Sequence, residues 1–324
     1  MTTTRDRLFA VVDRELTTVV RTPVYVGTAL GFVALVLGLT ATSGVTGYVP
    51  LTVDLLTPVE FLVPLLAVAF GYRAIQSDAA GKELHVLRTY PIPGWTYVLG
   101  VYLGRAAVVL SLVFATLVLA GVLVPLLGPP ANPVIASHGG DGSFAAYLRF
   151  VLLSTGYAAV VLAAVVAVST VAATGRTAIA AAVGLFVLLT VGLDLGLVGA
   201  LSAGLVGPDG LRYLLALSPN SAFRGLVFAL AVQSVEAATL PASAVVANVV
   251  GLTLWLVGSF VVATKTVWQN PTADRWATVA TLDGAGDDTS EAVGDDGVER
   301  ESAGPGQVDE HSAGPGTHGE SSED

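Results

Sequence analysis

Six long apolar runs restrict the fold of this 324-residue chain more than any other feature. They cover residues 25–42, 55–74, 106–127, 150–172, 177–196 and 242–264. Crossing the hydrocarbon core of a bilayer takes about 20 helical residues, and backbone groups in lipid must find partners within the protein. The chain is 53% hydrophobic and only 12% charged, whereas soluble domains average about 25% charged residues. The sequence therefore predicts an all-α integral membrane protein with six transmembrane helices, within a membrane domain covering residues 24–268.

The connection between the fifth and sixth runs, residues 197–241, leaves two interpretations open. It contains the stretches LRYLLAL (211–217) and SAFRGLVFALAVQSV (221–235), which are apolar but short. They are consistent with interfacial or re-entrant helices, or with one further pair of spans.

Lysine and arginine predict the orientation of the spans. Alternation across six spans places 12 of the 15 basic residues on one side, and only Arg149, Arg212 and Arg224 on the other. Cytoplasmic connections of membrane proteins carry the excess of Lys and Arg. We therefore expect a multi-pass plasma-membrane protein with both termini in the cytoplasm.

Residues 1–23 are predicted to form an amphipathic cytoplasmic helix that leads into the first span. At helical spacing, one face collects Leu8, Val12, Leu16, Val19 and Val20, and the opposite face collects Arg7, Arg14 and Arg21. Such a helix suits a membrane interface. Glu15 projects into the apolar stripe. It either extends to water, or forms a buried structural ion pair with a cationic side chain of residues 71–105.

Residues 269–324 are predicted to be a disordered acidic tail. The chain has a net charge of −10, and the tail accounts for most of its negative charge. Its sequence is rich in Gly, Ser and Asp and poor in large apolar residues. Such a segment buries too little surface to offset the entropy lost on ordering.

The polar segment 71–105, GYRAIQSDAAGKELHVLRTYPIPGWTYVLGVYLGR, separates the second and third apolar runs. Asp78 is placed to cap a short helix over 82–88, which would carry Leu84 and Leu87 on one face. Pro91 favours an end to that helix at Tyr90. The segment is either a cytoplasmic coupling element that a soluble partner grips, or a solvated loop that only follows the positive-inside rule.

Several kinds of chemistry are excluded by what the sequence lacks. It has no cysteine, and Met1 is the only methionine, so no thiolate or soft-metal site is predicted. It has no phosphate-cradling G-x-x-x-x-G-K-[ST] loop and no H-E-x-x-H motif. We therefore predict no catalytic, cofactor-binding or metal-binding residues. Glu60 and Asp194 are the acids within or beside spans, where ionisable groups often have a function; simple solvation near the outer surface is the competing interpretation.

Three stretches resemble the type-two family of ABC transporter permeases, over about residues 5–268. The first is the segment 71–105, whose matching positions are Ala74, Ile75, Asp78, Gly81, Leu84, Leu87, Pro91, Gly100 and Gly104. The second is RELTTVVRTP (14–23), which is similar to the amphipathic helix of that family, and the third is LSPNSAFRGL (217–226), which is similar to its Asn-Pro-x-x-x-x-Arg element. The sequence departs from the family at 92–94, at Val101, and at Ser218, where Asn is usual. Within the family, the chain is most similar to NosY-like permeases, which serve maturation of nitrous-oxide reductase, and to archaeal permeases labelled copper transport.

The resemblance implies a permease subunit that is not itself an enzyme and binds no cofactor. A separate ATPase chain would bind and hydrolyse the ATP, and the permease would form a homodimer. It implies that the ATPase is contacted through Asp78, Lys82, Glu83, Leu84, Leu87 and Arg88. A non-transporting membrane anchor that recruits a soluble protein through the same segment is the alternative. The substrate and the direction of transport stay open.

Overall fold

The computed structural model describes residues 4–45, 47–81, 93–126, 142–205, 207, 210, 213–232 and 241–269, and no strand occurs among them. It confirms the six predicted spans. They are α2 (Pro23–Ser43), α3 (Tyr48–Gly71), α6 (Gly94–Leu123), α7 (Phe144–Val171), α8 (Gly175–Val187) continued by α9 (Leu193–Ser202), and α12 (Ala242–Thr266). Short 3₁₀ turns, Val124–Leu126 (η1) and Val267–Gln269 (η6), extend α6 and α12. The predicted acidic tail lies outside the described residues.

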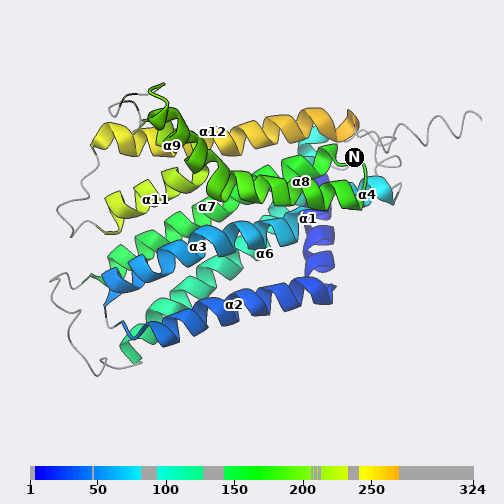
Figure 1. The fold of residues 1–324 in the computed structure, drawn as a ribbon. Coiled ribbons are helices and arrows are strands. Elements are labelled where there is room, and N and C mark those ends of the chain that lie inside the picture. The colour runs from blue at the N-terminus through cyan, green and yellow to red at the C-terminus, as the bar shows by residue number, and fades with distance from the viewer. Residues whose placement is uncertain are drawn as a thin grey trace, which may run out of the picture. The chain divides into compact units, whose positions relative to one another are not determined.

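Helix α1 (Thr4–Arg21) is the amphipathic helix expected before the first span. It lies across one end of the bundle, roughly at right angles to the spans, near the short helix α4 (Gln76–Ala80) (Figure 1). Pro23 occupies the start of α2, a position where its missing N–H is not needed, so the chain turns from α1 into the first span at this point. The predicted apolar stripe needs one correction: Val20 is 63% exposed, whereas Val11 packs against the core.

Two spans begin well before their apolar windows. α6 starts at Gly94 instead of residue 106, so residues 94–105 of the predicted segment 71–105 are helical and continuous with the third span. Residues 94–105 escape a hydropathy window because they include polar side chains such as Thr96, Tyr97 and Arg105. Some polar groups there bond within the bundle: Tyr102, for example, donates its hydroxyl to the Ala159 carbonyl at 3.1 Å. α3 likewise starts at Tyr48, which places Asp54 in its second turn.

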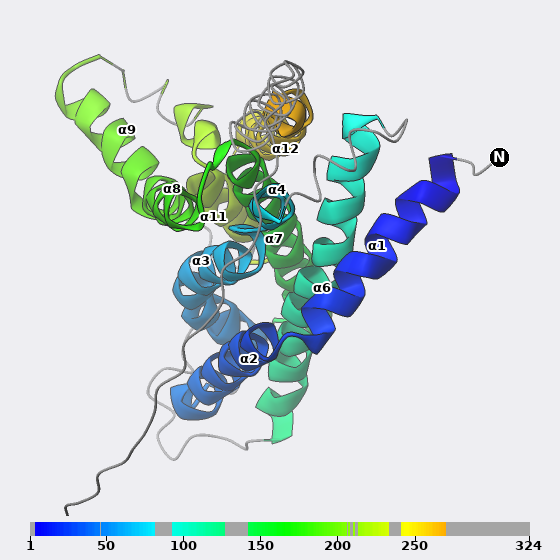
Figure 2. The same ribbon diagram turned by 90° about the vertical axis from the view of Figure 1, so that its right-hand side faces the viewer.

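Helix α7 is the central helix, and 67% of its most apolar window is buried. It packs against α3, α6, α11 and α12. Figure 2 shows the bundle turned by 90°, with α7 between these neighbours. Small side chains at Ala163, Ala164 and Ala167 are almost fully buried, and they allow close approach of neighbouring helices.

The fifth span is bent. A π-helical turn, Leu188–Gly192 (η3), joins α8 to α9, and such turns are a known cause of sharp kinks. Beyond it, α9 diverges from the bundle and has no buried residue (Figure 2).

The connection between the last two spans contains the 3₁₀ turn Leu215–Leu217 (η4) and α11 (Pro219–Leu230). With 12 residues, α11 is too short to cross a bilayer. It packs against α7 and α12 within the bundle. Among the described residues, the structure thus favours a short interfacial or re-entrant helix over a further pair of spans.

Candidate functional site

The contact between α1 and α6 depends on two glycines. A Cβ atom added to Gly100 would lie 2.7 Å from Cγ1 of Val11, and one added to Gly104 would lie 2.5 Å from Cβ of Glu15. Both distances are shorter than side chains tolerate. The Gly-x-x-x-Gly spacing therefore lets α1 cross directly over the backbone of α6, and it places the carboxylate of Glu15 against that helix.

Glu15 forms a buried ion pair there. Its side chain is 4% exposed, and its Oε2 lies 3.0 Å from Nε of Arg105, which is also 4% exposed. Of the two interpretations of Glu15, the geometry matches the buried partner of a cation from residues 71–105. The solvated alternative does not describe this side chain.

Arg105 extends the contact to two further spans. Its Nη1 donates to the carbonyl of Phe70 near the end of α3. The same nitrogen lies 3.4 Å from the hydroxyl of Tyr25 in α2, and the guanidinium lies 6.0 Å from the centre of that ring. Through its single guanidinium group, Arg105 therefore links α6 to α1, α2 and α3.

Asp78, in α4, forms the second half of the cluster. The hydroxyl of Tyr97 donates to its Oδ2 at 2.6 Å, and Nη2 of Arg14 donates to the same oxygen. Arg14 also donates to Oε1 of Glu15 at 3.0 Å. Burial lowers the pKa of the Arg14 guanidinium, but the charge of Asp78 and the hydrogen bonds to both acids outweigh this, so the pKa is raised above its ordinary value.

We call Arg14, Glu15, Asp78, Tyr97 and Arg105 the charge cluster. Two carboxylates and two guanidinium groups balance one another in it. Removing one member of a buried ion pair typically costs about 3–5 kcal/mol, because the other charge is left uncompensated. The cluster therefore holds α1, α4 and the start of α6 in one arrangement.

Asp78 differs from its predicted local role. It lies inside α4, it is buried, and its carboxylate accepts from Tyr97 and Arg14 within the protein. The backbone of α4 is also fixed, since the N–H of Ile75 donates to Oγ of Ser169 in α7 at 3.3 Å. The remaining predicted coupling residues, Lys82, Glu83, Leu84, Leu87 and Arg88, lie outside the described residues, as does the helix predicted to carry them.

A second polar group of side chains surrounds α11. Glu60 of α3 is 1% exposed, and its Oε1 accepts from Nε of Arg224 at 2.7 Å, with a second bond from Nη2 to Oε2. The interpretation of Glu60 as a solvated acid is therefore wrong. Asp194 of α9 is partly buried and accepts from Oγ of Ser221 at 2.8 Å.

The start of α11 explains why its sequence can depart from the family pattern. The side chain of Ser218 accepts from the N–H of Ser221, which is the N-cap role that Asn would also perform. The hydroxyl of Tyr157 donates to Oδ1 of Asn220 at 3.3 Å. The ring of Phe223 stacks on the Tyr157 ring, with 4.7 Å between the ring centres. Sequence reasoning identified this element but did not predict its partners on α3, α7 and α9.

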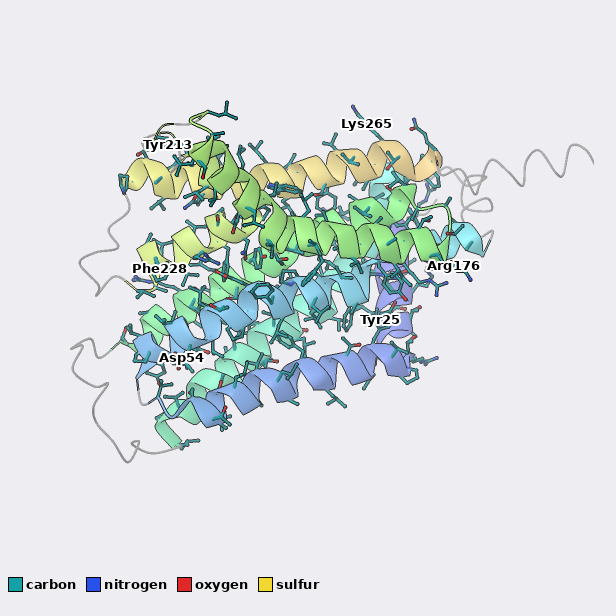
Figure 3. All side chains as sticks on the ribbon, viewed as in Figure 1. Tyr25, Asp54, Arg176, Tyr213, Phe228 and Lys265 are labelled. Carbon is teal, nitrogen blue, oxygen red and sulfur yellow. The ribbon has the colours of Figure 1, made fainter. Side chains whose placement is uncertain are left out.

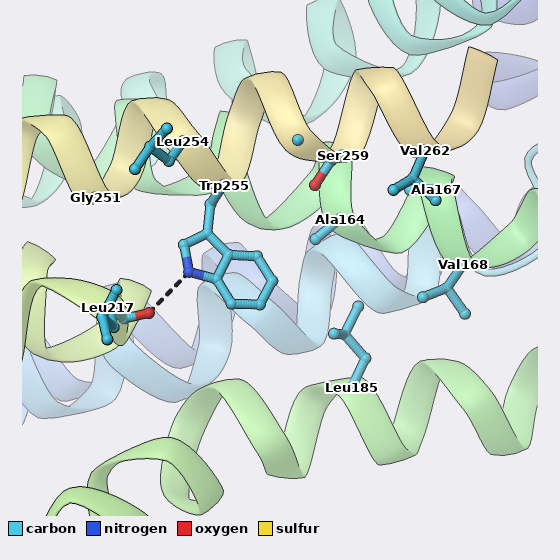
Figure 4. Close-up of a pocket in the computed structure, with 11 residues that line it drawn as sticks. Ala164, Ala167, Val168, Leu185, Leu217, Gly251, Leu254, Trp255, Ser259 and Val262 are labelled. Atoms are coloured by element: carbon cyan, nitrogen blue, oxygen red, sulfur yellow. Dashed lines mark hydrogen bonds between the residues drawn. The ribbon is translucent and has the colours of Figure 1, made fainter. Parts of the chain in front are cut away.

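An apolar cavity of about 390 Å³ lies between α7, α8 and α12 (Figure 4). Trp255 forms one side of it and donates its ring N–H to the carbonyl of Leu217 at 2.8 Å. The described residues that line the cavity are apolar apart from Ser259 and the indole N–H of Trp255. In the part of the chain that the structure describes, no group of three or more His, Cys, Asp or Glu side chains is placed to hold a metal ion.

Comparison with known proteins agrees with this architecture. The family model described as "ABC-2 family transporter protein" matches residues 13–270. A stretch of 192 residues is 31% identical to a protein of Pseudomonas aeruginosa described as "Probable ABC transporter permease protein NosY". The match covers 57% of this chain and 66% of the relative, just under two thirds of its length. The chain, a six-span membrane protein, thus belongs to the ABC-2 transporter family.

Proposed function

We propose that this chain is the membrane-spanning permease subunit of an ATP-driven transporter, in which a separate ATPase subunit hydrolyses the ATP. Family membership and six spans support a transporter membrane subunit. The sequence itself has no phosphate-cradling loop. Its likeness to the Pseudomonas protein supports a place in a NosY-like system.

The charge cluster is the observation that carries this proposal. The segment 82–92 connects α4 and α6 in the sequence, and both of these flanking helices are tied to α1: α4 through Asp78 and Arg14, and α6 through Arg105 and Glu15. Tyr97 of α6 also bonds directly to Asp78 of α4. Arg105 then links α6 to the carbonyl of Phe70 in α3. Because separating buried charges is costly, a partner that displaces α4 would move the ends of several spans together instead of bending one loop.

We assign contact with the ATPase to the side chains that follow α4. Leu84 and Leu87 are the apolar anchors, and Lys82, Glu83 and Arg88 meet complementary charges at the rim of the partner's groove. Buried anchors control dissociation, whereas rim charges mainly change association rate and salt response. Asp78 serves on the inner side, as the link from this segment to α1 and α6.

The orientation and assembly belong to the same proposal. The excess of Lys and Arg supports cytoplasmic placement of α1, α4 and both termini. A six-span unit whose sequence carries no nucleotide-binding motif supports a permease homodimer with two ATPase copies.

The decisive experiment is reconstitution of the purified chain with its ATPase subunit, followed by pull-down and ATP hydrolysis assays. Leu84→Asp places a charge in an apolar contact, so we expect loss of most ATPase recruitment. Lys82→Ala is the matched variant on the same segment and should retain the partner at low salt. Hydrolysis of ATP by the purified chain alone, or full recruitment by Leu84→Asp, would refute the proposal.

A second variant separates transport coupling from mere recruitment. Tyr97→Phe removes the hydroxyl that bonds to Asp78 at 2.6 Å and leaves the segment 82–88 unchanged. We expect the ATPase to remain bound, while its stimulation by the permease falls several-fold. Unchanged stimulation would favour a non-transporting anchor, because an anchor needs no mechanical link between α4 and α6.

A further inference from the structure

A cavity of about 240 Å³ lies between the last turn of α2 and the second turn of α3. One carboxylate, that of Asp54, and three hydroxyl residues contribute its polar lining; three leucines complete it. Figure 3 shows Asp54 at one end of the bundle, with Arg176 and Lys265 toward the other. The cavity is therefore separate from the charge cluster.

Each hydroxyl group in this cavity donates its hydrogen to a backbone carbonyl. They donate along α2: Thr40 to the carbonyl of Val36, Thr42 to that of Gly38, and Ser43 to that of Thr40, each at 2.9 Å. A hydroxyl has a single hydrogen, so each oxygen presents only lone pairs to other groups. Ionised Asp54 is also acceptor-only, and Asp54, Thr42 and Ser43 are exposed, so a ligand can reach them from outside the protein.

The surrounding backbone also favours a positively charged ligand. Ser43 is the last residue of α2, and the C-terminal end of a helix carries partial negative charge from its unpaired carbonyls. Asp54 adds a full negative charge, with no cationic side chain in the lining. The site therefore attracts a positively charged ligand, either one that donates hydrogen bonds or a metal ion that oxygen atoms coordinate. It repels anions.

We propose that Asp54, Thr40, Thr42 and Ser43 form a binding site for a monovalent cation, either an alkali-metal ion or a protonated primary amine. One carboxylate balances one positive charge, and carboxylate and hydroxyl oxygens are hard ligands that do not select soft metals such as Cu(I). A water molecule needs about 10–15 Å³ of such space, so a cavity of about 240 Å³ has room for the cation with part of its hydration shell. This site goes beyond the proposed transport function and does not depend on an ATPase partner.

The test compares salts at equal ionic strength, using the full chain purified in detergent. Thermal unfolding is followed by tryptophan fluorescence in sodium, potassium, methylammonium or tetramethylammonium chloride. Tetramethylammonium is the control cation, because it is bulky and donates no hydrogen bonds. A bound ligand raises stability in proportion to ln(1 + [L]/Kd), so the apparent Tm should rise by about 3 °C at ten times Kd, relative to tetramethylammonium.

Two variants locate the effect. Asp54→Asn keeps the shape of the side chain and should abolish the difference between salts, whatever its effect on overall stability. Asp13→Asn removes the same charge from an exposed position on α1 and should preserve the difference. An effect of sodium or potassium alone identifies a metal ion, and one of methylammonium alone identifies an amine. Equal curves for all four salts in the wild type, or a difference that persists in Asp54→Asn, would overturn the proposal.

Discussion

The ion pair between Glu15 and Arg105 allows a quantitative test of how α1 is held. Both side chains are 4% exposed, and their atoms approach to 3.0 Å across a sequence separation of 90 residues. Glu15→Gln removes the charge but keeps the side-chain volume. Because Arg105 would then be buried without its full counter-charge, we expect a loss of about 3–5 kcal/mol.

The loss should be specific to the pair. In a double-mutant cycle with Arg105→Met, the coupling energy should exceed about 1 kcal/mol, since the partners are in direct contact. The matched control is Asp13→Asn, which removes an exposed carboxylate from the same helix and should change stability by less than about 0.5 kcal/mol. Unfolding of the purified protein by denaturant, where reversible, supplies these values.

A second readout reports on α1 alone. The chain contains no cysteine, so Val19→Cys would introduce a single thiol at a position that is 2% exposed. We expect slow maleimide labelling at this site with Glu15 intact and labelling at least ten-fold faster in Glu15→Gln. Equal labelling rates, together with additive free energies in the cycle, would refute the view that this pair fixes α1.

Three further predictions concern other parts of the molecule. Gly104→Ala should destabilise the protein by about 1–3 kcal/mol, because its Cβ would meet Glu15 at 2.5 Å; Gly31→Ala, with nothing within 4 Å, is the control, and equal effects in thermal unfolding would contradict the close α1–α6 crossing. Arg224→Gln should destabilise the protein more than Glu60→Gln does, because Glu60 is 1% exposed whereas the Arg224 side chain is 47% exposed and can hydrate when left alone; the opposite order in denaturant unfolding would show that the arginine is the buried partner. Protease added outside intact cells should leave residues 271–324 uncut, and deletion from Gly286 onward should preserve membrane assembly; external removal of the tail would refute the proposed orientation.

Much of the fold was predictable from local sequence. Each of the six spans contains a run of apolar residues near the length a bilayer requires, and the amphipathic repeat before them predicted α1. These features depend only on residues close in the chain, because a helix in lipid satisfies its own backbone. Their boundaries were less predictable: α6 begins with a turn that includes Thr96 and Tyr97, whose polarity hides it from hydropathy.

The partners of the charged residues were decided by the tertiary structure. The local pattern left two interpretations open for Glu15 and for Glu60, because Arg105 and Arg224, their partners, are not near them in sequence. The register at which α1 crosses Gly100 and Gly104 places Glu15 beside Arg105. The return of α11 into the bundle likewise brings Arg224 to Glu60 across 164 residues. Apolar length determines that a segment crosses the membrane, but the path of the chain determines which buried charges meet.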